Sequence, residues 1–263
     1  MDHGIPMTPY FYAWFIGIPA IFVNIACGFR LFDLWPEPAR KGSRKSDIMA
    51  FQIIGFICVT YLGIAGAIAW FDLNSNWNFS TLSNDRINGH EQFVEDHLLM
   101  PMLSYQFWLI ILCLVMNDLR EISMIGHHVV TFGLSYVCLH PILGYFVCFY
   151  FGLAELTNIP LTVYDTFKYF PELKKTYPFA SEIIKYIFVI GFYILRIGVW
   201  SHVTYNMISI DLYPLLQSGE AHSNIVMIFF LFAAAFLTGL QWLWGYKIAY
   251  IVYIDKFNTK KIE

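Results

Sequence analysis

Charged residues are scarce in this sequence. Asp, Glu, Lys and Arg make up 13% of the 263 residues, about half the share found in a typical soluble domain. Hydrophobic residues make up 58%, and the mean hydropathy is +0.56. So few charges cannot cover the surface of a soluble protein of this length, so the composition indicates a chain built to lie in lipid.

Cysteine and net positive charge are also in short supply. The net charge is -3 and the isoelectric point about 6.2, so we expect no broad basic surface and no nucleic-acid partner. No basic start leads into a short apolar core with a cleavage site, so we expect no removable signal peptide. All five cysteines fall inside apolar stretches, where a thiol packs as a small hydrophobe: Cys27, Cys58, Cys113, Cys138 and Cys148.

Long polar stretches are missing too, since the longest, about 72–97, is too short to form an independent domain. A spanning helix needs about 20 mostly apolar residues and pairs its backbone groups internally. The sequence therefore predicts an all-α integral membrane protein with about seven transmembrane helices. The seven apolar segments are roughly 10–34, 48–71, 98–117, 122–140, 141–164, 181–206 and 223–254.

Basic residues are distributed unevenly between the two sides of these segments. The loops at about 72–97 and 207–222, with the N-terminal tail, contain only Arg86. The positive-inside rule therefore predicts a lumenal or outer N-terminus and a cytosolic C-terminus. The opposite side holds the remaining basic clusters: Arg30, Arg40, Lys41, Arg44, Lys45, Arg120, Lys168, Lys174, Lys175, Lys185, Lys256, Lys260 and Lys261.

Two short motifs agree with this orientation. Asn78-Phe79-Ser80 is a glycosylation sequon in the long loop assigned to the lumen. The ending Lys260-Lys261-Ile262-Glu263 resembles the dilysine retrieval signal of endoplasmic reticulum membrane proteins. We therefore predict an endoplasmic reticulum protein, with a mitochondrial or other internal membrane as the alternative.

Ionisable residues inside spans are costly and are functional candidates by default. At about 1.5 Å per residue, His127 and His128 lie about 8 Å below the cytosolic surface, within reach of a water-soluble co-substrate. Adjacent helical residues point about 100° apart, so we expect unequal roles for the two. Glu155 and Asn158 share a helical face, and Glu155 is the leading partner for the deeper Arg196.

Other chemistries fit the sequence less well. A metal centre needs several His at helical spacing on facing helices, whereas one adjacent pair is present, so we expect no metal. Lys247 in the last segment suits a side chain that reaches the headgroups. A remote alternative is a seven-helix receptor or retinal protein in which Lys247 forms a Schiff base.

Four motifs follow one another along the chain. They are Gly126-His127-His128-Val129-Val130-Thr131, Gly152-Leu153-Ala154-Glu155-Leu156-Thr157-Asn158-Ile159-Pro160, Leu195-Arg196 and Leu240-Gln241-Trp242-Leu243-Trp244. In order and spacing they resemble the TLC-domain family, which includes the ceramide synthases and less understood proteins concerned with membrane lipid composition. The resemblance covers about residues 45–255, with 1–44 as an added transmembrane helix and basic cytosolic loop, and 256–263 as a cytosolic tail.

The resemblance implies six helices in a ring around a lipid cavity, with the N-terminal helix outside the ring. It implies His127 and His128 as catalytic residues, assisted by Glu155. Ceramide synthases carry a His-Asp and a second Asp where this chain has Ala154, Glu155 and Asn158, so it lies closer to the less understood branch. We expect the cavity to be lined by Thr157, Asn158, Arg196, His202, Gln241 and Trp244.

Two functions remain open on this basis. One is lipid binding in the cavity, serving membrane lipid homeostasis or a non-catalytic role in a larger membrane complex. The other is acyl-CoA-dependent N-acylation of a long-chain lipid through His127 and His128. We expect membrane lipids as partners, sphingoid or other long-chain lipids among them. No cofactor is expected, with acyl-CoA as co-substrate if the protein is an enzyme.

Overall fold

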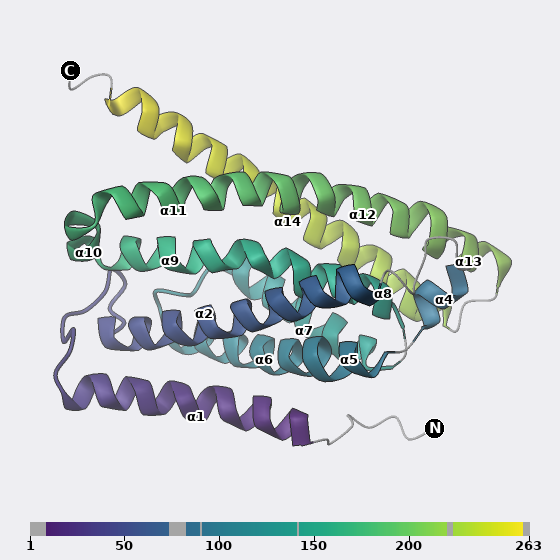
Figure 1. Ribbon diagram of the computed structural model, residues 1–263, viewed down its shortest axis with the longest axis horizontal. Helices are drawn as coiled ribbons and strands as arrows, with labels where there is room; N and C mark the ends of the chain where they lie inside the picture. Colours follow the sequence, from purple (N-terminus) through teal and green to yellow (C-terminus); the bar gives the residue numbers. More distant parts are fainter. Residues whose placement is uncertain (1–8, 74–82, 90, 141, 220–222, 260–263) are drawn as a thin grey trace.

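The structure is a computed structural model that describes residues 9–73, 83–89, 91–140, 142–219 and 223–259. The predicted sequon at 78–80 and the Lys260-Lys261 ending lie outside these residues. Within the described ranges every regular element is helical, and the long helices run side by side along the long axis (Figure 1). Short helices cap the two ends. We call these the α10 end and the α13 end.

Six helices are long and apolar enough to cross a membrane, and α7 is a shorter apolar helix of 17 residues. The prediction of an all-α, multi-pass membrane protein is therefore confirmed. The first four spans are α1 (Pro9–Leu31), α2 (Lys45–Ile68) with η1 (Ala69–Leu73), α5 (Gln92–Val94) with η2 (Glu95–Leu99) and α6 (Met100–Val115), and α7 (Ile122–Cys138).

The remaining three spans are interrupted or long. They are α8 (Gly144–Val147) with η3 (Cys148–Gly152), η4 (Leu153–Thr157) and α9 (Asn158–Tyr169); α11 (Pro178–Gly191) with η5 (Phe192–Val199), α12 (Trp200–Asn206), η6 (Met207–Leu212) and α13 (Tyr213–Ser218); and α14 (Asn224–Thr259). Two short helices, α4 (Ser83–Asn88) and α10 (Pro171–Thr176), lie at opposite ends (Figure 1).

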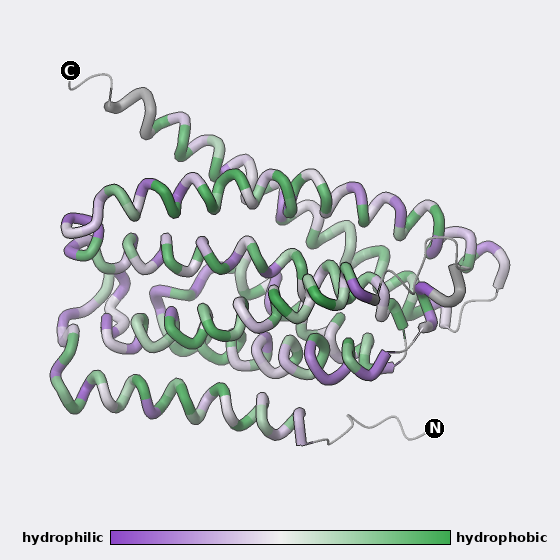
Figure 2. The backbone as a smooth tube through the Cα atoms, viewed as in Figure 1, coloured by the Kyte–Doolittle hydropathy of each residue, from purple (hydrophilic) through white to green (hydrophobic). Residues whose placement is uncertain are grey.

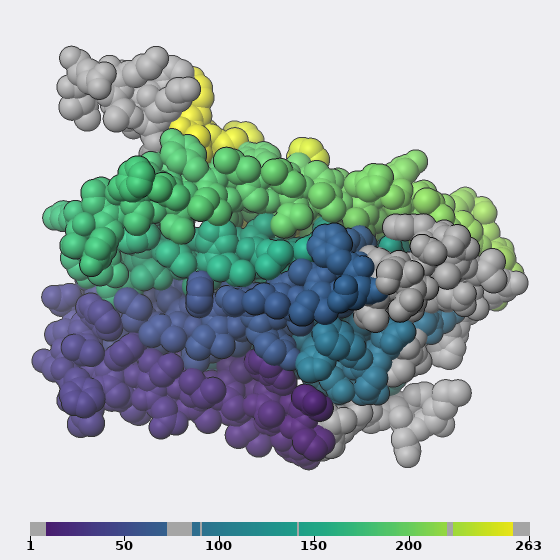
Figure 3. Space-filling view, viewed as in Figure 1, coloured from purple at the N-terminus to yellow at the C-terminus, as the bar shows by residue number. Residues whose placement is uncertain are grey.

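Six of the spans close a ring. Going round it, α2 contacts α6, α6 contacts α7, α7 contacts α14, α14 contacts η5 and α12, α11 contacts α9, and α9 contacts α2. The α1 helix packs outside the ring against α2 and α6, at the edge of the molecule (Figure 3). Hydrophobic residues run along the outer helices α1, α11 and α14 (Figure 2), as a lipid-facing surface requires.

The sixth span is longer than the predicted segment 181–206, since it runs from Pro178 to Ser218. The residues after 206 include Ser209 and Asp211, which made that stretch too polar for a predicted span. In the structure Asp211 is buried and paired. Arg86 of α4 donates to its carboxylate from Nε at 3.1 Å and from Nη2 at 2.5 Å. This neutralisation allows the helix to continue to the α13 end.

Helix α2 meets the fifth span at a glycine contact. A Cβ atom on Gly66 would lie 2.0 Å from the Cα of Gly152, closer than real atoms approach. A Cβ on Gly63 would lie 2.8 Å from the side chain of Leu156. Small residues at membrane helix crossings let backbones approach closely, and this contact fixes the depth of the η3 and η4 turns that lead to Glu155.

Candidate functional site

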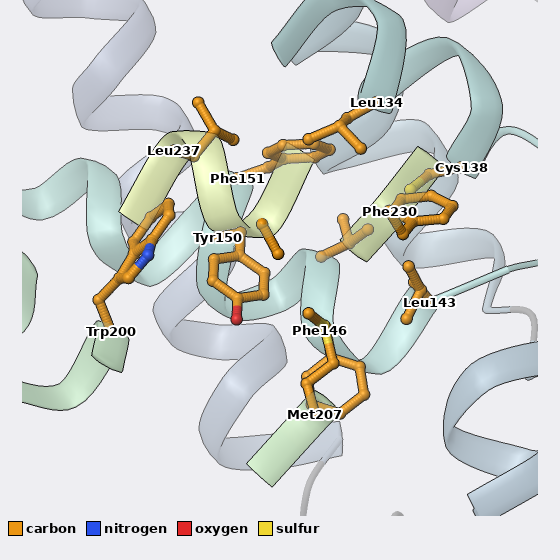
Figure 4. A pocket seen from close by; sticks show the side chains of 12 residues that line it. Leu134, Cys138, Leu143, Phe146, Tyr150, Phe151, Trp200, Met207, Phe230 and Leu237 are labelled. Atoms are coloured by element: carbon orange, nitrogen blue, oxygen red, sulfur yellow. The ribbon is translucent and has the colours of Figure 1, made fainter. Parts of the chain in front are cut away.

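The ring of helices leaves an apolar cavity toward the α13 end, and Figure 4 shows the side chains that line it. The empty space among them is about 440 Å³, which includes the open space at the mouth of the cavity. Two polar groups of the wall are hydrogen-bonded: the Tyr150 hydroxyl shares a 2.8 Å hydrogen bond with Thr204, and the Trp200 indole donates to Thr238 at 3.0 Å. The walls come from α7, the fifth and sixth spans and α14: Leu134, Cys138, Leu143, Phe146, Val147, Tyr150, Phe151, Trp200, Met207, Phe230, Ala234 and Leu237.

Polar residues follow the cavity on its α10 side. On four of the spans, a buried polar residue lies about one helical turn from a cavity-lining residue, on the side toward the α10 end. We call this group, with its direct neighbours Thr157, Asn158, His127 and His128, the polar layer. The four pairs, cavity residue first, are Leu134 and Thr131, Phe151 and Glu155, Trp200 and Arg196, and Leu237 and Gln241.

The centre of the polar layer is an ion pair. The Arg196 guanidinium donates from Nη2 to Glu155 at 2.9 Å and from Nε to the Thr157 hydroxyl at 3.0 Å. Asn158 donates to the second Glu155 oxygen at 2.7 Å, and Trp200 places its ring 5.7 Å from the guanidinium. Arg196 and Glu155 are 4% and 6% exposed, so each neutralises the other inside the bundle.

Non-α turns position both members of the pair. Glu155 lies in η4, a 3₁₀ helix that follows the π-helical turn η3. Arg196 lies in η5, which is π-helical over eight residues. Such turns rotate side chains away from the positions that a regular helix would give them, and they are common at functional sites.

The two histidines have unequal surroundings. His128 is buried, and its Nδ1 lies 2.7 Å from Oε1 of Gln106 on α6. His127 contacts the Trp244 ring edge-on, with ring centroids 5.4 Å apart, and it is close enough to Arg196 to interact electrostatically. Its Nδ1 is buried without a hydrogen-bond partner. Nδ1 of His127 is therefore unpaired inside the bundle, whereas Nδ1 of His128 is engaged by Gln106.

Gln241 is the most unusual member of the polar layer. Its side chain is fully buried, yet neither its amide nitrogen nor its amide oxygen has a hydrogen-bond partner. The hydroxyl of Thr131, 4% exposed, is also unpaired. Most buried polar groups in proteins are paired, so these unpaired atoms make this part of the polar layer a candidate ligand site.

The structure places the predicted cavity residues outside the walls of this apolar cavity. His202 is exposed on α12 and bonds to Asn206 at 3.0 Å, because its neighbours Trp200, Val203 and Thr204 occupy the inward face. It therefore does not line the cavity. Thr157, Asn158, Arg196, Gln241 and Trp244 are also absent from the cavity walls. They lie in or beside the polar layer.

Sequence reasoning missed the apolar walls themselves. The signal was present in α14, where residues 230, 234, 237, 241 and 244 follow a three-and-four spacing that places them on one helical face. Such a stripe is also the ordinary pattern of helix packing. A cavity along it becomes visible only when the opposing helices are placed.

The remaining ionisable candidate, Lys247, lies at the edge of the molecule. Its Nζ is 3.2 Å from Glu121, and both side chains are about half exposed. The Ser123 hydroxyl and Lys247 together hold the pKa of the Glu121 carboxyl below its usual value. Among the described residues, no three His, Cys, Asp or Glu side chains gather as a metal site would require.

Comparison with known proteins agrees with this architecture. No curated protein matches the chain. The TLC-domain family profile matches residues 49–250, from near the start of α2 to the last third of α14, and this range includes the whole polar layer. Helix α1 lies outside the matched region, as it lies outside the ring. The chain therefore belongs to the TLC-domain family.

Proposed function

We propose that this TLC-domain protein binds a membrane lipid inside its helical ring and serves membrane lipid homeostasis, alone or as a non-catalytic subunit of a membrane complex. The observation that carries the proposal is the order found on four helices, with an apolar cavity followed by a buried polar layer. A lipid has the same two parts. Its tail would replace empty space against aromatic and aliphatic walls, and its head would reach polar groups.

The lipid content of the purified protein tests this proposal. Ala234 lines the cavity, whereas the adjacent Ala235 is exposed on the outer face of α14. Ala234→Phe should fill the cavity and reduce co-purified lipid, measured by native mass spectrometry, at least fivefold. Ala235→Phe adds the same volume outside and should leave the bound lipid unchanged. Equal lipid content in wild type and both variants would contradict the proposal.

The same proposal places the protein in the endoplasmic reticulum, with its α13 end in the lumen. The basic loops at the α10 end support this orientation through the positive-inside rule. If it holds, Asn78 faces the lumen and its sequon is accessible to glycosylation. We expect a glycosidase-sensitive mobility shift that Asn78→Gln removes. A shift gained instead by a sequon introduced at 40–44 would reverse the orientation.

A second candidate function is acyl transfer, and the free Nδ1 of His127 favours it. A long-chain amine would attack the thioester carbonyl of acyl-CoA, forming a C–N bond and breaking the C–S bond. His127 would take the proton from the amine and deliver it to the departing CoA thiolate. The seven-helix receptor and retinal alternatives lose support, because the chain belongs to the TLC-domain family and Lys247 pairs with Glu121 at the surface.

Labelled acyl-CoA distinguishes this candidate from lipid binding alone. Membranes containing the protein are supplied with labelled acyl-CoA and sphingoid or other long-chain amines. An acyl-amide product that His127→Ala abolishes, while the variant keeps its folded yield, would establish transfer. Bound lipid without product would leave lipid binding as the function.

A further inference from the structure

Helices α7 and α14 form an antiparallel seam along one side of the cavity. A Cβ on Gly126 would lie 3.4 Å from the Phe236 ring, and one on Gly133 would lie 3.6 Å from the Phe229 ring. The two helices therefore run in opposite directions. Each helix presents residues at three-and-four spacing. The α7 stripe is His127, Thr131, Leu134 and Cys138, and the α14 stripe is Phe230, Ala234, Leu237, Gln241 and Trp244.

Both stripes change from apolar to polar residues on passing from the α13 end toward the α10 end. Toward the α13 end, their residues are those that line the apolar cavity: Leu134, Cys138, Phe230, Ala234 and Leu237. Toward the α10 end, the stripes carry four buried atoms without hydrogen-bond partners. These are His127 Nδ1, Thr131 Oγ1 and both amide atoms of Gln241. The seam is thus amphipathic along its length.

An unpaired buried polar group destabilises a folded protein, so four of them together would destabilise the bundle when the site is empty. A primary amide and a hydroxyl each offer both a donor and an acceptor. A head group that offers the same combination, such as a hydroxyl or an amide, would pair with them. A saturated hydrocarbon end would leave them unpaired.

The charges of the polar layer restrict the head group further. Arg196 and Glu155 form an ion pair at 2.9 Å and neutralise one another. Arg196 also donates to the Thr157 hydroxyl, and Asn158 donates to Glu155. The three residues that carry unpaired atoms are a histidine, a threonine and a glutamine, which supply no fixed charge. An ammonium, carboxylate or phosphate would enter without a counter-charge, at a large desolvation cost.

We therefore infer that the seam selects an uncharged lipid whose head group is a hydroxyl or an amide, held by Gln241, Thr131 and His127, with its tail in the apolar cavity. This inference rests on the proposed function, since it presupposes that a lipid occupies the cavity. It adds the chemical class of the ligand and assigns head-group selection to Gln241. His127 and Thr131 complete the site from α7.

Four photoactivatable probes with the same 16-carbon chain test the inference on the purified full-length protein. Their heads are a primary alcohol, a primary amide, an amine and a carboxylic acid. We expect the alcohol and amide probes to label peptides of α7 and α14 at least tenfold more strongly than the two charged probes. Competition with the unlabelled alcohol should remove the labelling.

Two substitutions make the assignment of Gln241 specific. Gln241→Leu should lower labelling by the alcohol and amide probes about tenfold. Gln241→Glu introduces a carboxylate of nearly the same size and should shift the preference toward the amine probe, a gain that a folding defect cannot mimic. Ser181→Ala is the control, because Ser181 on α11 is also buried and unpaired but lies three residues from the start of that helix.

These experiments distinguish a failure of head-group selection from a failure of lipid binding. Equal labelling of α7 and α14 by charged and uncharged probes, or unchanged preference in both Gln241 variants, would overturn the head-group inference while lipid binding stands. Absence of labelling in the cavity by all four probes, together with unchanged co-purified lipid in Ala234→Phe, would overturn both.

Discussion

His127 and His128 are neighbours in the chain but differ in what holds them. His128 is bonded to Gln106 across the α6–α7 contact, whereas Nδ1 of His127 is unpaired inside the polar layer. A histidine bonded between two packed helices stabilises the bundle. His127 is only half-buried, and its unpaired Nδ1 makes no hydrogen bond between helices, so we expect it to contribute less to that packing.

Substituting the two histidines separately should therefore give opposite results. His128→Ala removes an interhelical hydrogen bond and leaves Gln106 unpaired, which should cost about 1–2 kcal/mol and lower the melting temperature. His127→Ala should change thermal stability much less and instead reduce bound lipid. Thermal unfolding in detergent and native mass spectrometry measure the two effects. Equal destabilisation by both variants would contradict the division of roles.

The Arg196–Glu155 pair gives the second prediction for single residues. Glu155→Leu leaves the guanidinium buried without its counter-charge and should cost about 3–5 kcal/mol. The double variant Glu155→Leu/Arg196→Met removes both charges and should recover most of that loss. The control is the more exposed pair of Lys168 and Asp165, 3.6 Å apart, with side chains 51% and 32% exposed, and Asp165→Leu should cost less than about 1 kcal/mol. A double variant as unstable as the single one would show that the pair is not coupled.

The fifth and sixth spans depart from regular α-helical geometry at several turns. The fifth span passes from α8 through π and 3₁₀ turns before α9 begins, and the sixth contains the π-helical η5 and η6. These turns lie at the cavity and at the ion pair. The fifth span is held at this depth by the close approach of Gly152 to Gly66 of α2.

The glycine contact predicts a sharp difference between glycines of the same chain. Gly66→Ala places a methyl group against the backbone of Gly152, so α2 must move away from the fifth span at a cost of about 1–3 kcal/mol or more. Gly239→Ala is the control, since a Cβ there meets nothing within 4 Å. That change should be neutral or slightly stabilising in a helix. Folded yield and melting temperature in detergent compare the two, and equal values would contradict the predicted contact.

At the scale of the whole molecule, the ring is closed at the α13 end by α4, which packs against α8 and η6. The ion pair of Arg86 and Asp211 stabilises this contact, and the two residues are 3% and 1% exposed, respectively. Met207 of the cavity wall lies four residues before Asp211, one helical turn away. The ion pair therefore holds the end of the cavity as well as the end of the sixth span.

Breaking this ion pair should loosen the α13 end without unfolding the ring. Asp211→Asn removes the counter-charge of a buried arginine, and we expect faster hydrogen exchange over residues 83–89 and 207–218. Exchange at the α10 end of α2 and α9 should stay unchanged and is the internal control. An exchange increase spread evenly over all spans would show instead that the pair supports the whole bundle.

The sequence by itself determined the membrane class and the number of spans, because apolar length is a local property that no distant contact can alter. It also indicated Glu155 as the partner of Arg196, since a buried guanidinium needs a carboxylate and few were available inside the spans. The family followed from motifs whose order survives without knowledge of the packing.

Only the tertiary structure decided which side chains share a space. His202 fitted the sequence pattern of a cavity residue but faces outward, because its place on α12 puts Trp200, Val203 and Thr204 inward. The predicted sixth span stops at 206, before Asp211, yet the partner of Asp211, Arg86, is 125 residues away and permits a longer helix. The division between apolar cavity and polar layer arises where four helices meet, so no single segment of sequence contains it.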